Sequence, residues 1–125
     1  MAREIFEHIG GSDWAVTRQF VYAGERGQIG KLALAVAAVA DADPVARAIL
    51  RDAGGELARL GTAMTERFGA RPYVLSGRVV GLHPVIEASF RARLPAHASV
   101  QVRVSTAHCA AARIAVKMAG QECAE

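Results

Sequence analysis

The sequence predicts a helix-rich α/β fold in which a short pair of parallel strands is covered by helices. The 125 residues are 52% apolar but only 6% aromatic, so the core must consist mainly of Ala, Val, Leu and Ile. Two short apolar segments alternate with helical patterns in the order helix, strand, helix, strand, helix, which is typical of a parallel pair. The first strand begins only at residue 73. Two strands are few for an independent layered sheet, so we expect part of a larger lobe.

The amino-terminal part of the chain reads as a set of helices. A short helix over residues 3–9 is expected to end at Gly10, because glycine readily adopts the backbone conformation that closes a helix. Ser12 can cap the next helix with its hydroxyl group. The alanine-rich run from 29 to 40 then predicts a buried helix.

The longest predicted element is an amphipathic helix over residues 44–68. Asp43 is a good N-cap, and Pro44 stands at the first helical position, where a missing N–H costs nothing. Gly69 is expected to end the helix. The apolar face of this helix is a stripe of residues at steps of three and four: Val45, Ile49, Ala53, Leu57, Leu60, Met64 and Phe68.

Two glycines, Gly54 and Gly55, lie in the middle of this helix. Each costs on the order of 1 kcal/mol there relative to alanine, so their presence needs a reason. One explanation is close packing against another helix. The other is a flat patch without side chains that admits a planar ligand.

The carboxy-terminal half supplies the two strands. Residues 73–75 are too short and too apolar for anything but a buried strand. Residues 82–94 read as a helix with one apolar side. Apolar and polar residues alternate from 99 to 104, which predicts the second strand, and residues 106–118 predict a closing helix.

Composition excludes several classes of function. Lys and Arg number 15 against 12 for Asp and Glu, and the arginines are spread along the chain, so we expect no nucleic-acid partner. The longest apolar run, 32–40, is about half of the ~20 residues that a membrane span needs. Cys109 and Cys123 form no CxxC motif, and the first residues make no secretion signal. We therefore expect a soluble cytoplasmic protein without membrane contact.

Motifs for phosphate, metal or nucleophile chemistry are incomplete. The segment 23–31 resembles a P-loop, but Glu25 and Leu32 stand where that motif needs Gly and Ser or Thr. The four histidines have no partner at metal-ligand spacing, and Ser76 lacks the GxSxG elbow of a hydrolase nucleophile. None of these predicts a catalytic residue.

Three segments taken together resemble a known family. They are DADPVARAILRDAGGELARL at 41–60, RPYVLSGRVVGLHPVIEASFRARLP at 71–95 and VQVRVSTAHCAAARIAVKMAG at 100–120. Their order and spacing resemble the carboxy-terminal part of the bacterial N-acetylglucosamine/glucosamine kinases, which are BadF/BadG/BcrA/BcrD-type ATPases of the actin-like ATPase and sugar kinase superfamily. The resemblance implies a partial ribonuclease H-like lobe.

The resemblance also implies how the chain is divided. Residues 1–42 would be a helical segment that packs on the lobe, and residues 43–120 a nucleotide-clamp α/β region. Residues 121–125 would be a tail.

Site residues are implied by position in the family motifs. Ser76 and Gly77 would face the adenosine of a nucleotide, with Gly54 and Leu57 behind the base. Backbone without side chains admits a purine closely, and N–H groups at a helix start favour phosphate or ribose oxygens. Arg78 stands where many relatives have a second glycine, and it would either intrude on the pocket or stack on the base.

The activity implied by the family is phosphoryl transfer from ATP, with Mg²⁺, to the 6-hydroxyl of N-acetylglucosamine or glucosamine. The phosphate loops, the Mg²⁺ ligands and the catalytic base of the family have no counterpart in this sequence. We therefore expect a distal half of a kinase, inactive alone, whose missing lobe binds the amino sugar. Two alternatives stay open. One is a non-catalytic module whose apolar helices form a homodimer or recruit a separately encoded lobe, and the other is an iron–sulfur ATPase activator of a dehydratase or reductase.

Overall fold

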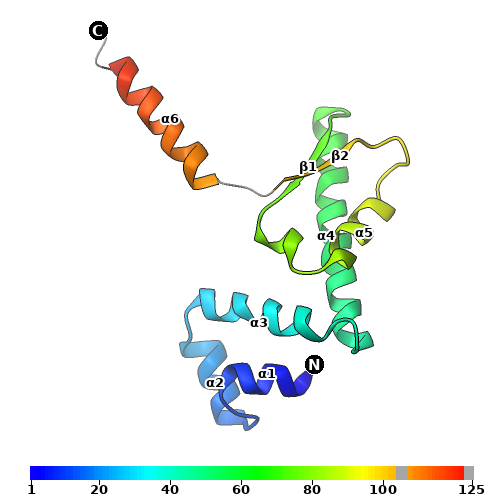
Figure 1. Ribbon diagram of the computed structural model, residues 1–125, viewed down its shortest axis with the longest axis vertical. Helices are drawn as coiled ribbons and strands as arrows, with labels where there is room; N and C mark the ends of the chain where they lie inside the picture. The colour runs from blue at the N-terminus through cyan, green and yellow to red at the C-terminus, as the bar shows by residue number, and fades with distance from the viewer. Residues whose placement is uncertain (104–106, 123–125) are drawn as a thin grey trace.

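The computed structural model describes residues 1–103 and 107–122. It is helix-rich, with one short parallel sheet, as predicted (Figure 1). Its elements in chain order are α1 (Ala2–Ile9), α2 (Trp14–Ala23), α3 (Arg26–Val39), α4 (Pro44–Phe68), β1 (Tyr73–Ser76), the 3-10 helix η1 (Arg78–Gly81), α5 (Pro84–Ala92), β2 (Val100–Arg103) and α6 (Ala107–Glu122). No helix in the described ranges is long and apolar enough to cross a membrane.

The first two helices form close to where the sequence predicts them. Gly10 adopts a φ of 90° and ends α1, as expected. The cap of α2 is Asp13, whose Oδ1 accepts a hydrogen bond from the N–H of Val16 at 2.9 Å. The prediction of Ser12 as the cap is therefore wrong by one residue, because the Asp13 carboxylate is the group that reaches the first turn.

Helix α3 is less buried than its alanine-rich sequence predicts. Of its residues only Val36 is buried, and Ala40 follows it just after the helix end, while Leu34 is exposed. The helix contacts α1 and α4, and these neighbours cover only part of its surface. The predicted burial of the whole run is wrong because nothing in the described chain covers its other side.

Helix α4 begins and ends as predicted. Asp43 Oδ1 accepts hydrogen bonds from the N–H groups of Val45 and Ala46 at 2.9 and 3.2 Å, and Pro44 occupies the first turn. At the other end the N–H of Gly69 donates to the carbonyl of Thr65. Local capping chemistry is sufficient to fix both ends.

The buried face of α4 differs from its predicted apolar stripe. The buried residues are offset from the stripe and mostly small: Ala46, Leu50, Gly54, Gly55 and Ala58. Large members of the stripe are exposed: Val45, Ile49, Leu60, Met64 and Phe68. Helix α5 packs along α4, and the small residues let the two helices approach closely. The buried face of α4 is therefore the one whose small side chains allow close helix packing, and not the one with the largest apolar side chains.

The sheet consists of β1 and β2, paired in parallel from Tyr73 opposite Val100 to Ser76 opposite Arg103. Leu75 is buried, whereas Val74 is exposed on the other face. Helices α4 and α5 therefore cover one face only, so the predicted burial of the strand holds for Leu75 and is wrong for Val74. The last residue of the predicted 99–104 strand lies outside the described residues.

Helix α5 joins two hydrophobic clusters. One contains Ile86 together with Val36, Ala40, Ala46 and Leu50. The other contains Phe90 and Leu94 with Ala58 and Leu75. Because α5 contributes to both, it connects the helical amino-terminal part to the sheet.

Helix α6 does not close the fold. Figure 1 shows it, in orange and red, away from the other elements. Its residues from 108 to 119 are all exposed, including Ile114, Val116 and Met118. The predicted closing role is therefore not seen in the described structure.

Candidate functional site

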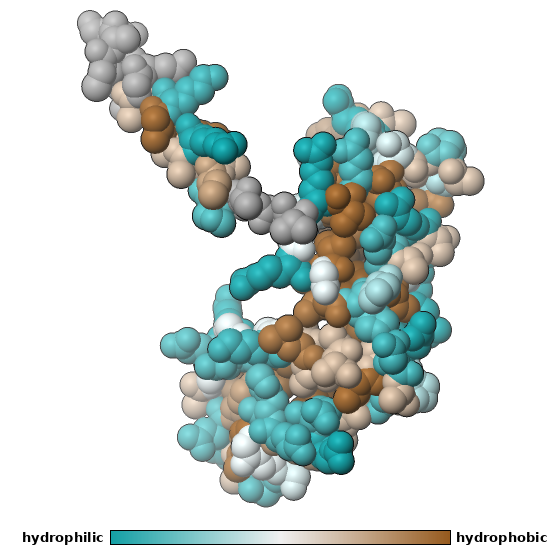
Figure 2. Space-filling view, viewed as in Figure 1, coloured by the Kyte–Doolittle hydropathy of each residue, from teal (hydrophilic) through white to brown (hydrophobic). Residues whose placement is uncertain are grey.

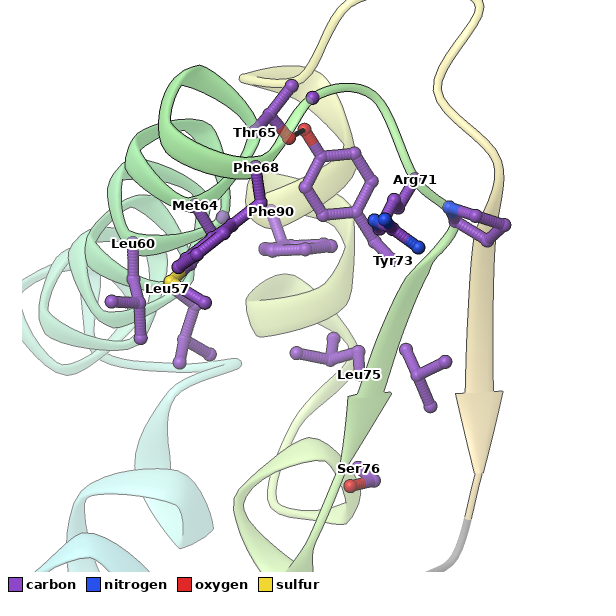
Figure 3. A pocket seen from close by; sticks show the side chains of 14 residues that line it. Leu57, Leu60, Met64, Thr65, Phe68, Arg71, Tyr73, Leu75, Ser76 and Phe90 are labelled. Atoms are coloured by element: carbon purple, nitrogen blue, oxygen red, sulfur yellow. Dashed lines mark hydrogen bonds between the residues drawn. The ribbon is translucent and has the colours of Figure 1, made fainter.

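An open groove of about 730 Å³ lies between the carboxy-terminal half of α4 and β1. We call it the α4–β1 groove. One wall consists of α4 side chains, the other of β1, and Phe90 of α5 lies between them (Figure 3). The α4 wall consists of Leu57, Leu60, Met64 and Phe68. Figure 2 shows hydrophobic residues gathered in a band over α4 and β1 on this side of the molecule.

Few polar groups interrupt this apolar surface. Thr65 Oγ1 and Tyr73 Oη lie 2.6 Å apart and share a hydrogen bond, so each partly satisfies the other. The Tyr73 ring meets Phe90 edge-on, with ring centres 6.2 Å apart. Arg71 lies at the amino end of β1 and Ser76 at its carboxyl end (Figure 3). Arg71 is the one charged side chain among the described residues that line the groove.

The structure brings together two of the five predicted nucleotide-contacting residues. Leu57 and Ser76 both line the α4–β1 groove. Gly54, Gly77 and Arg78 do not line it.

Gly54 serves helix packing. A Cβ atom at this position would collide with the carbonyl oxygen of Ile86 and would lie 2.9 Å from Ser89 Cβ. Ser89 is also anchored there, because its Oγ donates to the carbonyl of Arg51 at 2.6 Å. Helix α5 therefore fills the space where an adenine ring was expected, and the ligand explanation for Gly54 is replaced by the packing explanation.

The turn after β1 is open. Gly77 has a φ of 108°, which favours glycine, and a Cβ atom there would meet nothing within 4 Å. Arg78 is exposed and begins η1, so its side chain does not fill the bend. This turn, Ser76–Gly77–Arg78, leaves its backbone accessible at the carboxyl end of a parallel strand.

The start of α5 offers fewer free donors than expected. His83 caps this helix: its Nδ1 accepts from the N–H of Val85 at 3.2 Å, and its Nε2 lies 3.2 Å from Asp41 Oδ1. The N–H of Ile86 donates to the His83 carbonyl. A nucleotide at the turn would therefore rely on the backbone of residues 76–78 more than on the end of α5.

Metal ligands are not assembled in the described part of the chain. Among residues 1–103 and 107–122, no three or more His, Cys, Asp or Glu side chains are grouped so that they could hold a metal ion. Mg²⁺ for phosphoryl transfer would have to be held by other groups. Cys109 is exposed on α6, and Cys123 lies outside the described residues. The iron–sulfur alternative, which would need cluster cysteines near a dimer interface, therefore stays a prediction.

Sequence reasoning missed the large open wall of the groove. It assigned Leu60, Met64 and Phe68 to the apolar face of α4, and the structure leaves them exposed along the groove. The signal that could have found this surface is the small number of strands. A helix of seven turns carries more apolar surface than two four-residue strands can cover.

Comparison of the chain with protein-family models, with curated proteins and with solved structures gives no match. The kinase-family resemblance of residues 41–60, 71–95 and 100–120 therefore stays a prediction from the sequence.

Proposed function

We propose that this chain is the nucleotide-contacting, carboxy-terminal part of an ATP-dependent hexosamine kinase. The observation that carries the proposal is the open Ser76–Gly77–Arg78 turn at the carboxyl end of a parallel strand. Open α/β sheets bind ligands outside the carboxyl ends of their strands. The whole enzyme would transfer the γ-phosphate of ATP to a hydroxyl of N-acetylglucosamine or glucosamine, and other parts of it would supply the phosphate cradle, the metal and the base.

The turn and the groove offer complementary contacts to a nucleotide. Ser76 joins the two, because it ends β1 and also lines the α4–β1 groove together with Leu57. The hydroxyl of Ser76 and the exposed backbone of Gly77 suit ribose or phosphate oxygens. The exposed guanidinium of Arg78 is placed to pair with a phosphate or to stack on a base. These contacts support binding and no chemical step.

Nucleotide-dependent thermal stabilisation tests this proposal. ADP at one hundred times its dissociation constant should stabilise the chain by about 2.7 kcal/mol, seen as a higher melting temperature. Ser76→Trp fills the junction of turn and groove and should abolish the shift. Gln101→Trp is the matched control, because Gln101 is exposed on the neighbouring strand, opposite Val74. Absence of a shift at millimolar ADP, or an equal shift in Ser76→Trp, would refute the proposal.

A second function, a partner-binding module, is favoured by the α4–β1 groove itself. Leu60, Met64 and Phe68 form a continuous apolar surface, and contiguous apolar surface of this kind marks interaction sites. Met64→Asp places a charge in the groove and should weaken binding of any partner. Leu34→Asp, on the exposed part of α3, is the control. Light scattering tests the predicted homodimer: a dimer that only Met64→Asp dissociates would identify a second copy as the occupant of the groove, and a monomer would leave the groove to a different partner.

A further inference from the structure

Strand β1 has one edge without a neighbouring strand. The N–H of Tyr73 donates to the carbonyl of Ser99 at 2.8 Å, so Tyr73 turns its backbone polar groups toward β2. Backbone groups of successive residues in a strand point to opposite edges. Val74 and Ser76 therefore turn their N–H and C=O groups away from β2, toward the α4–β1 groove that both residues line.

The groove beside this edge has the dimensions of one strand. Figure 3 shows Leu60, Met64 and Phe68 on the side of β1 opposite to β2. They are 63%, 52% and 53% exposed and stand one helical turn apart, so they span about 12 Å along α4. The four residues of β1 span a similar length at about 3.3 Å each. A strand paired with β1 would lie about 4.8 Å from it, over these side chains.

We propose that the α4–β1 groove is the position of a third strand, supplied by an extended segment of a partner polypeptide. The segment would hydrogen-bond to Val74 and Ser76 and place apolar side chains at alternate positions on α4. This inference deepens the partner-binding function and rests on it. It does not require nucleotide binding at the Ser76–Gly77–Arg78 turn, although Ser76 belongs to both sites.

Backbone chemistry favours a strand over a helix. Exposed N–H and C=O groups at a sheet edge are a template for pairing with another strand. A helix satisfies its own backbone internally, so burying this edge under a helix would leave Val74 and Ser76 without hydrogen-bond partners. The apolar wall of α4 then selects alternating apolar side chains, because one face of a strand carries every second residue.

The positive charge of Arg71 indicates which residues the partner segment should carry. Arg71 lies at the amino end of the groove and forms no ion pair with any described residue. An acidic side chain in the segment would complement it. A second copy of this chain would bring the wrong charge, because its own strands carry Arg71 before β1 and Arg103 at the end of β2. The partner is therefore a different polypeptide with an acidic residue beside its apolar alternation.

Selection of short peptides from a random display library on the full chain tests the inference. Binding peptides should carry apolar residues at every second position and an acidic residue at one end. Val74→Pro removes the N–H that faces the groove but keeps the β1–β2 hydrogen bonds, as edge strands allow. It should weaken a selected peptide about tenfold or more. Val102→Pro alters the outer edge of β2 instead and should change affinity less than about twofold.

The outcomes separate the strand from the partner-binding function. Selected peptides with apolar residues at steps of three and four, or equal binding of a peptide to Val74→Pro and to the wild type, would overturn the proposed third strand. If Met64→Asp still weakened binding of such peptides, the groove would remain a docking site. No selected peptide would reject the foreign strand. Insensitivity of peptide binding and of self-association to Met64→Asp would reject the docking groove as well. A homodimer that Met64→Asp dissociates would replace the foreign strand with a second copy. If Val74→Pro does not fold, N-methylation of alternate peptide amides tests the same hydrogen bonds on the wild-type chain.

Discussion

Replacing Gly54 by alanine tests the contact between α4 and α5 on which the assignment of the site depends. A Cβ atom at Gly54 would run into the backbone carbonyl of Ile86, which cannot rotate away as a side chain does. Gly30 provides the matched control. It also lies inside a helix, α3, but a Cβ atom there would meet nothing within 4 Å.

The magnitudes follow from two effects of opposite sign. Alanine is favoured over glycine inside a helix by about 1 kcal/mol, so Gly30→Ala should stabilise the chain by up to that amount. Gly54→Ala gains the same helix propensity but overpacks the α4–α5 contact, which costs about 1–3 kcal/mol or more. We therefore expect Gly54→Ala to be less stable than Gly30→Ala by about 1–3 kcal/mol.

Urea unfolding followed by circular dichroism measures this difference. With the slopes usual for small proteins, the midpoints of the two variants should differ by on the order of 1 M urea. A Gly54→Ala variant as stable as Gly30→Ala would show that α5 does not lie tightly on Gly54. The space expected for a planar ligand would then be open again.

Two further predictions concern hydrogen bonds at the ends of α4. The Met1 ammonium and, next, the Ala46 N–H lower the pKa of Asp43 below its ordinary value of 3.8. Because the pKa of Asp43 is lowered in the folded state, the carboxylate contributes stability that is present above pH 3.8 and is lost as pH falls through the folded pKa. The difference in the free energy of unfolding between wild type and Asp43→Asn should therefore shrink as the pH is lowered. Tyr73→Phe removes the hydrogen bond to Thr65 and should cost about 0.5–1.5 kcal/mol in urea unfolding; Thr65→Val should add little to it.

Features that depend on neighbouring residues could be predicted from the sequence. Asp43, Pro44 and Gly69 set the ends of α4 through chemistry within one turn of the chain. The parallel pairing was also predictable, since a helix between two short apolar runs leaves few other connections. The cap of α2 was one residue off because Ser12 and Asp13 are both good capping residues, and their sequence does not rank them.

Features that depend on distant residues could not be predicted. The stripe along α4 was visible, but which face is buried depends on α5, and Gly54 and Gly55 were the only local sign of that contact. Leu57 and Ser76 were brought together by the family resemblance alone, and they do line one groove. Gly54 was assigned to the same site because the resemblance gives position along the chain and not the direction in which a helical residue points.

The two apolar faces of α4 explain why the groove and the short sheet occur together. One face, mostly of small residues, is covered by α5, and the other, from Leu60 to Phe68, is left half or more exposed by the described chain. A helix that is apolar on both sides belongs between two layers, because each face loses contact with water only when something packs on it. Strand β1 is the edge strand of the sheet, and the exposed side chains of α4 lie beside its free edge. A single added strand would therefore cover these side chains and pair with β1 at the same time. The uncovered apolar face of α4 and the unpaired edge of β1 are independent observations. Because one added strand would account for both, together they support the proposed third strand more strongly than either does alone.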